Sequence, residues 1–139
     1  LTIVYANACP GSSVTIDLDF TSLVSAEISA ISTDITFDSS ILSNPEAAIG
    51  LAGVAANKDV VMSVIDENTI RVAVLSIANN TVIGDGVIAT LTFDVSSSAQ
   101  IGGQADLAHI ASASTPGGEN APIQSIDGSV MIVTCCLGD

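Results

Sequence analysis

The residues that could perform acid–base or nucleophilic chemistry are few in this chain. A Ser-His-Asp set could form only around His109, and no G-x-S-x-G nucleophile elbow is present. His109 stands among apolar residues in a run typical of a strand, which favours a structural or surface role. Asp17 and Asp19 could act as paired carboxylates, but alternate residues of a half-buried strand share its solvated face. We therefore predict that this protein is not an enzyme.

Three cysteines, Cys9, Cys135 and Cys136, lie near the two ends of the chain. They lack the C-x-x-C spacing of a zinc site, so we expect no metal and no cofactor. If the first and last strands are neighbours, Cys9 could form a disulfide with Cys135 or with Cys136; three free buried thiols are the alternative. A disulfide would close nearly the whole chain into one loop and would indicate an oxidising compartment.

The charge balance restricts the partners of this protein. Fifteen Asp and Glu residues are opposed by only Lys58 and Arg71, which gives a formal net charge of −13 at pH 7. Such a surface repels nucleic acids and anionic membranes. The longest apolar run, at 47–56, is too short to cross a bilayer. We expect no nucleic-acid partner and no membrane insertion, and dispersed acids that keep the domain soluble explain the charge better than a metal site.

Short alternating segments account for most of the chain and predict strands. In 84–95, for example, Val87, Ala89, Leu91 and Phe93 share one face, and an Asp-Gly turn precedes them. The other predicted strands are Leu1–Ala8, Val14–Phe20, Ala26–Phe37, Val60–Asp66, Thr69–Ala78, Gln104–Thr115 and Ser125–Val133. Asn44–Gly50 carries helix-start and helix-stop residues and predicts one or two helical turns. Gly50–Ala56 predicts a short strand or a packed loop.

These elements predict an all-β fold, a nine-stranded β-sandwich with jelly-roll topology. One predicted strand, Thr69–Ala78, is apolar on both faces: Ile70, Val72 and Val74 on one, and Ala73, Leu75 and Ile77 on the other. A sheet that faces water normally has a polar outer face, so we expect a partner to cover this one.

Several motifs, in order, resemble cohesin modules, the receptor domains that capture dockerins in cellulosomes and related extracellular assemblies. They are the DG-x-x-A-T-x-x-F-x-V string from Asp85, the PGS turn from Pro10 before an alternating strand, the Phe37-Asp38 strand end with Leu42 after it, and the late Asp127-Gly128. The resemblance covers residues 1–134, which we expect to form one domain. Residues 135–139 end in Leu-Gly-Asp, as many dockerins begin, and we expect a C-terminal tail that starts a linker or a dockerin.

The resemblance implies a non-catalytic module that binds a calcium-loaded dockerin through one flat sheet face, made of the third, fifth, sixth and eighth strands. The calcium would belong to the dockerin, and the location would be secreted or cell-surface. Mapped onto this chain, the binding residues are Ala30, Ser32, Asp34, Thr36, Val61, Ser63, Ile65, Arg71, Ala73, Leu75 and Ile77. Leu75 and Ile77 are the expected anchors, and the facing of the eighth strand is left open.

Ala30 and Ser32 stand where familiar cellulosomal members carry Asn and Asp, which allows a divergent, non-cellulosomal cohesin. The same face could also support a weak homodimer. The sequence also allows two other functional hypotheses: a carbohydrate-binding module and a cell-surface adhesion β-sandwich. The first needs exposed aromatic rings, and the chain offers only Tyr5 besides three Phe on predicted inward faces.

Overall fold

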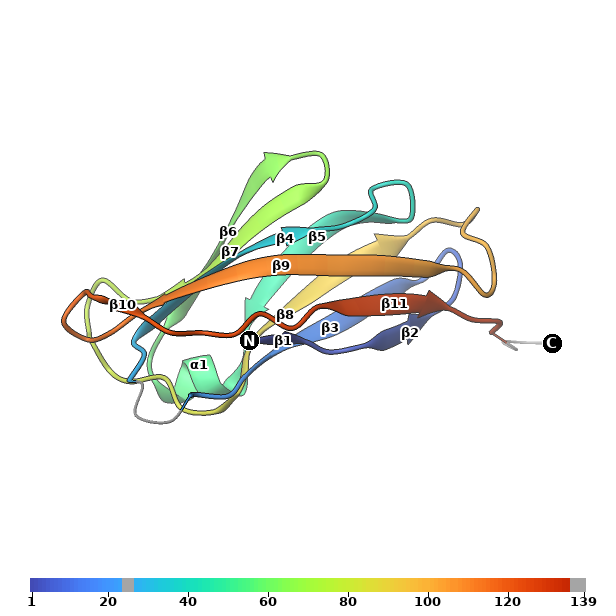
Figure 1. The fold of residues 1–139 in the computed structure, drawn as a ribbon. Coiled ribbons are helices and arrows are strands. Elements are labelled where there is room, and N and C mark those ends of the chain that lie inside the picture. Colours follow the sequence, from blue (N-terminus) through green and yellow to red (C-terminus); the bar gives the residue numbers. More distant parts are fainter. Residues whose placement is uncertain (24–26, 136–139) are drawn as a thin grey trace.

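The computed structural model describes residues 1–23 and 27–135 of the chain (Figure 1). Its strands form two sheets that pack as a β-sandwich of jelly-roll type, which confirms the predicted fold class. The strands are β1 (Thr2–Ile3), β2 (Ala6–Ala8), β3 (Ser13–Phe20), β4 (Ala30–Thr36), β5 (Leu42–Ile49), β6 (Asp59–Asp66), β7 (Thr69–Leu75), β8 (Gly86–Val95), β9 (Gln104–Ser114), β10 (Asn120–Ala121) and β11 (Gly128–Ile132). One short helix, α1 (Leu51–Ala55), follows β5.

The first sheet has the strand order β1-β3-β8-β5, and the second has the order β2-β11-β9-β4-β7-β6 with β10 beside β9. The pairing of β2 with β11 is parallel, and the others are antiparallel. The segment Leu1–Ala8, predicted as one strand, is divided between the sheets: β1 pairs with β3, and β2 pairs with β11. The N-terminal segment therefore joins the two sheets along one side of the sandwich.

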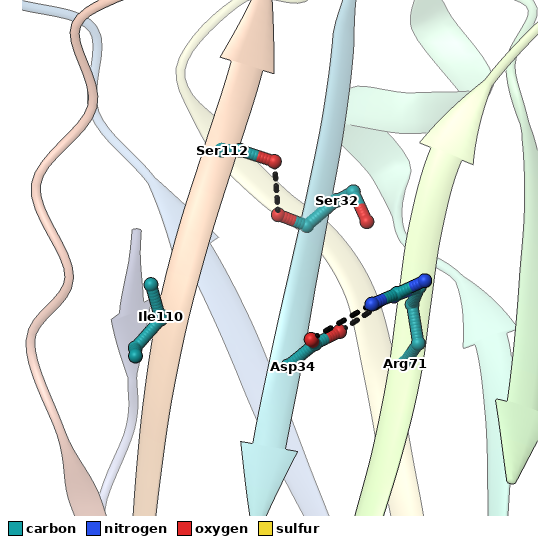
Figure 2. Close-up of a pocket in the computed structure, with 5 residues that line it drawn as sticks. All are labelled: Ser32, Asp34, Arg71, Ile110 and Ser112. Carbon is teal, nitrogen blue, oxygen red and sulfur yellow. Dashed lines mark hydrogen bonds and ion pairs between the residues drawn. The ribbon is translucent and has the colours of Figure 1, made fainter. Parts of the chain in front are cut away.

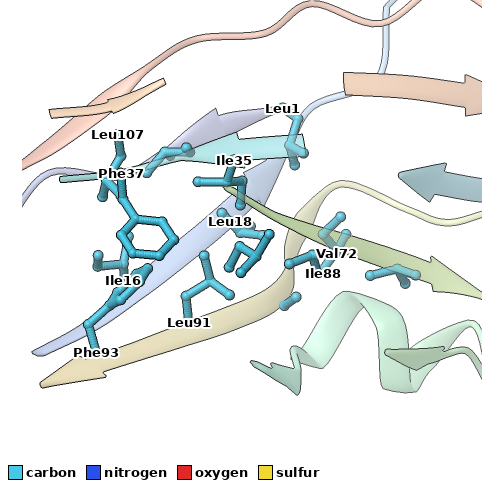
Figure 3. Packing of buried hydrophobic residues seen from close by; sticks show 14 of the residues in the cluster. Leu1, Ile16, Leu18, Ile35, Phe37, Val72, Ile88, Leu91, Phe93 and Leu107 are labelled. Carbon is cyan, nitrogen blue, oxygen red and sulfur yellow. The ribbon is translucent and has the colours of Figure 1, made fainter. Parts of the chain in front are cut away.

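Apolar side chains from both sheets fill the space between them (Figure 3). Along β8, Ala89, Leu91 and Phe93 are fully buried, as the alternation of this strand predicts. The rings of Phe37 and Phe93 pack with their centroids 5.0 Å apart and tilted by 57°. Phe20 is buried as well, so all three Phe side chains belong to the core, as expected.

The prediction of a helix at Asn44–Gly50 is wrong, because these residues belong to β5 and its end. The pairing of β5 with β8 shifts between Ser43 and Glu46, which marks a bulge, and Asn44 adopts a φ of 50°. The bulge accommodates Pro45, which has no N–H to donate to a regular ladder, and β5 is the edge strand of its sheet.

The segment Gly50–Ala56, predicted as a strand or loop, contains α1 instead. Gly50 precedes the helix, and its N–H donates to the carbonyl of Ile88 at 2.8 Å. The helix packs on β8 at a bulge, because Leu18 pairs with Ala89 and Asp19 with Val87, which leaves Ile88 between them unpaired. Ile88 is 1% exposed and packs in the core beside Val72 (Figure 3). The run of small residues therefore packs against β8 where its pairing with β3 is irregular.

A disulfide joins Cys9 to Cys135, whose Cα atoms lie 5.7 Å apart across a sequence separation of 126. This resolves the pairing that the sequence left open, and Cys136 lies outside the described residues. Within 1–23 and 27–135, no helix is long and apolar enough to cross a membrane.

Candidate functional site

The strands β6, β7, β4 and β9 are neighbours in one sheet, and their outward side chains form a surface that we call the four-strand face. Pairing registers align these side chains in rows across the strands. Ser32 lies opposite Ala73 of β7 and Ser112 of β9. One step along, Asp34 lies opposite Arg71 and Ile110. The predicted residues of the third and sixth strands are therefore side by side.

An ion pair occupies the centre of the face. The Arg71 Nε donates to Asp34 Oδ1 at 2.7 Å, and a second guanidinium nitrogen donates to Oδ2 at 3.0 Å. The hydrogen bonds from Arg71 lower the pKa of Asp34, and those to Asp34 raise the pKa of Arg71. Both side chains are about half exposed, so solvent screens the pair and its main effect is to cancel two charges and fix their orientation.

A shallow hollow of about 420 Å³ lies over this ion pair (Figure 2). Ser32 and Ser112 line it on one side, and the Ser112 hydroxyl donates to the Ser32 carbonyl at 3.5 Å. Ile110 lines the hollow from β9 and is 80% exposed. Polar groups with fixed positions therefore stand beside an exposed apolar side chain.

Apolar side chains continue along the face beyond this hollow. Val61 of β6 is 52% exposed and lies opposite Ala73. Leu75 is half-buried, and together with Ala30 it lines a second, smaller hollow that reaches Ser114 and Asn120. Ser63 lies opposite Arg71 and extends the row of the ion pair to β6.

Three predicted residues lie at or beyond the margin of the face. Thr36 is exposed at the end of β4, opposite Thr69 and Ala108. Ile65 falls where the pairing of β6 with β7 shifts, between Val64 and Asp66. Ile77 is fully exposed, but it follows the end of β7 at Leu75. The sheet register therefore does not align Ile77 with the other members.

The predicted eighth strand is β9, and the structure shows which of its side chains point outward, a question that the sequence left open. Its buried positions are Ala105, Leu107, His109 and Ala113, so Asp106, Ala108, Ile110 and Ser112 point outward. Ile110 is the main residue that sequence reasoning missed. Leu107 and Ile110 are both apolar but lie on opposite faces of the strand, because they are three residues apart. The sequence alone therefore does not tell which of the two is buried.

His109 belongs to a buried network rather than to an exposed cleft. Its Nδ1 is 2.7 Å from the Thr33 hydroxyl, and its Nε2 is 3.0 Å from the Ile126 carbonyl. Burial lowers the pKa of His109. In the described part of the chain, no three His, Cys, Asp or Glu side chains cluster in a way that could hold a metal ion.

The two cationic side chains of the protein are both engaged. Arg71 binds Asp34, while Lys58 is buried and donates from Nζ to Asn79 Oδ1 at 2.8 Å. Burial lowers the pKa of Lys58. The Asp34–Arg71 pair is therefore a locally neutral part of the four-strand face, which also carries the exposed acids Asp59 of β6 and Asp106 of β9.

The chain is a two-sheet jelly-roll sandwich whose second sheet has a partly apolar outer face. A model of the cohesin domain family matches residues 1–132. The chain therefore belongs to the cohesin domain family.

Solved cohesin structures share this fold. The sixth cohesin of scaffoldin B from Acetivibrio cellulolyticus, solved with a mutant Cel5 dockerin, is 21% identical, with a TM-score of 0.83 and coverage of 94% of this chain and 96% of that chain. A type I cohesin–dockerin complex from Clostridium thermocellum is 17% identical, with a TM-score of 0.81 and coverage of 95% and 96%. A non-cellulosomal cohesin from the archaeon Archaeoglobus fulgidus is 18% identical, with a TM-score of 0.76 and coverage of 96% and 89%. No curated protein matches the chain.

Proposed function

We propose that this domain is a non-catalytic interaction module that binds a calcium-loaded dockerin through the four-strand face. Membership of the cohesin domain family supports this, and two of the three similar structures described above are complexes with a dockerin. The observation that carries the proposal is the composition of the face, where the exposed Ile110 lies beside an ion pair whose charges cancel (Figure 2) and Val61 is exposed farther along the sheet. Exposed apolar surface of this kind marks interaction sites.

Binding would draw its energy from apolar burial and its register from polar groups. Ile110 and Val61 lose exposed surface when a helix covers them, and complete burial of such a side chain is worth about 1.5–3 kcal/mol. The Asp34–Arg71 pair is already formed without a partner, so its geometry costs no further ordering on binding. Ser32 offers a hydroxyl beside the pair for a directional hydrogen bond.

The cellular setting follows from the same proposal. Calcium would reside in the dockerin, and this domain would need no cofactor of its own. The Cys9–Cys135 disulfide supports a secreted or cell-surface location, because disulfides persist in oxidising compartments. A carbohydrate-binding role for the four-strand face has less support, because Phe20, Phe37 and Phe93 are buried and the one exposed ring among the described residues, Tyr5, lies before β2 and outside the four strands.

Calorimetric titration of the domain with a panel of dockerins, each with calcium and with chelator, tests the proposal. We expect one-to-one binding that requires calcium. Failure to bind any dockerin would count against the dockerin partner, and a glycan array and sedimentation analysis would then test carbohydrate binding and homodimer formation.

Charged substitutions on the face test its location. Leu75→Asp and Ile110→Asp should each abolish or strongly weaken dockerin binding, because a carboxylate would be buried without a partner. Leu51→Asp is the matched control, since Leu51 is 85% exposed on α1, away from the four-strand face. Unchanged affinity in Leu75→Asp and Ile110→Asp, with their folds intact, would show that the dockerin binds elsewhere.

A further inference from the structure

A third hollow lies on the same sheet nearer its β2 edge, between β9, β11 and the segment before β2. Its volume is about 300 Å³, and its lining includes Tyr5, Gln104, Asp106, Asp127 and Ser129. It shares no residue with the hollow over Asp34 and Arg71. Nothing in the dockerin proposal uses it.

The hollow combines an exposed aromatic ring with carboxylates. Tyr5 is 74% exposed, whereas the other three aromatic side chains of the protein are buried. Asp106 lies opposite Ser129 in the pairing of β9 with β11, and Asp127 is two residues before Ser129. Such diagonal neighbours across two antiparallel strands are separated by about 7–8 Å, a gap that one planar donor group can bridge.

The charged polar atoms left free in the hollow are carboxylate oxygens. Gln104 Nε2 donates to Asp106 Oδ1 at 2.8 Å, which leaves the Gln104 carbonyl oxygen and Asp106 Oδ2 available. Asp127 Oδ1 accepts the backbone N–H of His109 at 3.0 Å, which leaves Asp127 Oδ2 available. Neither Lys58 nor Arg71 lines the hollow. Two carboxylates therefore have no cationic partner there.

We infer that this hollow binds a guanidinium group, the side chain of an arginine carried by a protein partner. A guanidinium offers five N–H donors and a positive charge, which complements the free carboxylate oxygens of Asp106 and Asp127, and its plane can stack on an exposed aromatic ring such as Tyr5. The net charge of −13 attracts cations toward the surface.

The inference goes beyond the dockerin-binding proposal and does not depend on it. The test is an NMR titration of the whole chain, in its disulfide form, with a capped Gly-Arg-Gly peptide. The control is the same peptide with citrulline, a neutral analogue of arginine of nearly the same shape. We expect saturable shifts of the backbone amides of Tyr5, Asp106 and Ser129 with arginine, and at least about tenfold weaker binding with citrulline.

Substitutions place the binding in the hollow. Asp106→Asn and Tyr5→Ala should each weaken arginine binding by about tenfold, while Tyr5→Phe should retain it because the ring remains. Glu119→Gln removes one acid from an exposed turn outside the hollow and should leave binding unchanged. The residues that line the hollow over Asp34 and Arg71 are kept in all four variants, so a loss of arginine binding with dockerin binding retained is distinguishable from failure of dockerin binding.

Three results would overturn the inference. Shifts that spread over the acidic surface without saturating would mean nonspecific attraction. Saturation by cellobiose at the same amides, with none by arginine, would make the hollow a sugar site. Calcium chloride that displaces arginine and shifts Asp106 and Asp127 by itself would make it a metal site.

Discussion

His109 connects β9 to two other segments through hydrogen bonds. Its ring contacts the Thr33 hydroxyl of β4 and the Ile126 carbonyl before β11, and its backbone N–H donates to Asp127. With both ring nitrogens engaged and the side chain 5% exposed, the neutral imidazole fits this position best. Burial accordingly lowers the pKa of His109, although the nearby Asp127 carboxylate acts in the opposite direction.

The lowered pKa of His109 predicts a loss of stability in mild acid. The unfolded chain binds a proton at its single histidine at a higher pH than the folded protein does, so stability is complete above the unfolded pKa and falls as pH decreases toward the folded pKa. Urea denaturation between about pH 7.5 and 5.5 should show this decrease in the wild type and a flatter profile in His109→Gln.

The carboxyl groups of Asp34 and Asp38 do not obscure this comparison. Hydrogen bonds from Arg71 and Ser40 lower their pKa values, so their own losses of stability occur at more acid pH. An equally steep profile in His109→Gln would contradict a neutral, buried histidine.

The sequence predicted many of the outward residues of the four-strand face, but not all of them. The outward positions of β4 and β7 followed from alternation, because Ile31, Ile35 and Val72 set an unambiguous buried phase. On β9, small residues weaken that signal. The polar His109 is buried and the apolar Ile110 is exposed, which is the reverse of what their side chains suggest. Ile110 could be assigned only once the pairing of β9 with β4 was known.

At the scale of elements, the contact between α1 and β8 depends on the absence of a side chain at Gly50. A Cβ added there would press on the Val87 carbonyl and would lie 2.8 Å from the Ile88 carbonyl carbon, inside van der Waals contact. Those atoms are backbone of a central strand and cannot move independently of the sheet. Glycine therefore permits the close approach of the helix start to β8.

Gly50→Ala should lower the free energy of unfolding by about 1–3 kcal/mol, as overpacking of a close contact does. Gly84→Ala is the matched control, because a Cβ there meets nothing within 4 Å. Chemical denaturation of both variants measures the difference. Equal stability of the two would show that α1 is not packed on β8 as described.

The elements that sequence analysis assigned wrongly are those around this contact. Asn44, Pro45 and Gly50 are the residues that begin and end helices, but here they form a bulge, an edge-strand position and a close backbone contact. Local preference was overruled by pairing of β5 with β8, which involves residues about 50 positions away. The short helix α1 carries no polar face that would reveal it.

At the scale of the whole molecule, the disulfide connects the end of β2 to the segment after β11. Cross-linking Cys9 to Cys135 restricts the unfolded chain over nearly its full length. Because long loops gain the most in the chain-entropy model, Cys9→Ser should lower the free energy of unfolding by about 2–5 kcal/mol. The wild type in reducing agent should behave like Cys9→Ser, and the variant should be insensitive to the reagent. Identical denaturation of oxidised and reduced wild type would contradict the disulfide.

The overall fold was predictable because its strands alternate and its motifs follow one another in order. The disulfide pairing was not predictable, because Cys135 and Cys136 are adjacent in the sequence and either could lie next to Cys9 in the fold. Only the parallel pairing of β2 with β11 determines which thiol is brought to within bonding distance.

The disulfide also determines how the domain would respond to mechanical force. Tension applied to the two ends of the chain would pass from the first nine residues through the sulfur atoms to Cys135 and would bypass everything between. The enclosed segment, with a sequence separation of 126, could otherwise extend by roughly 400–450 Å. Single-molecule pulling should therefore release only a short length under oxidising conditions and the long one after reduction. The domain would then act as a nearly inextensible link when oxidised, and the length that it releases under force would depend on the redox state of its surroundings.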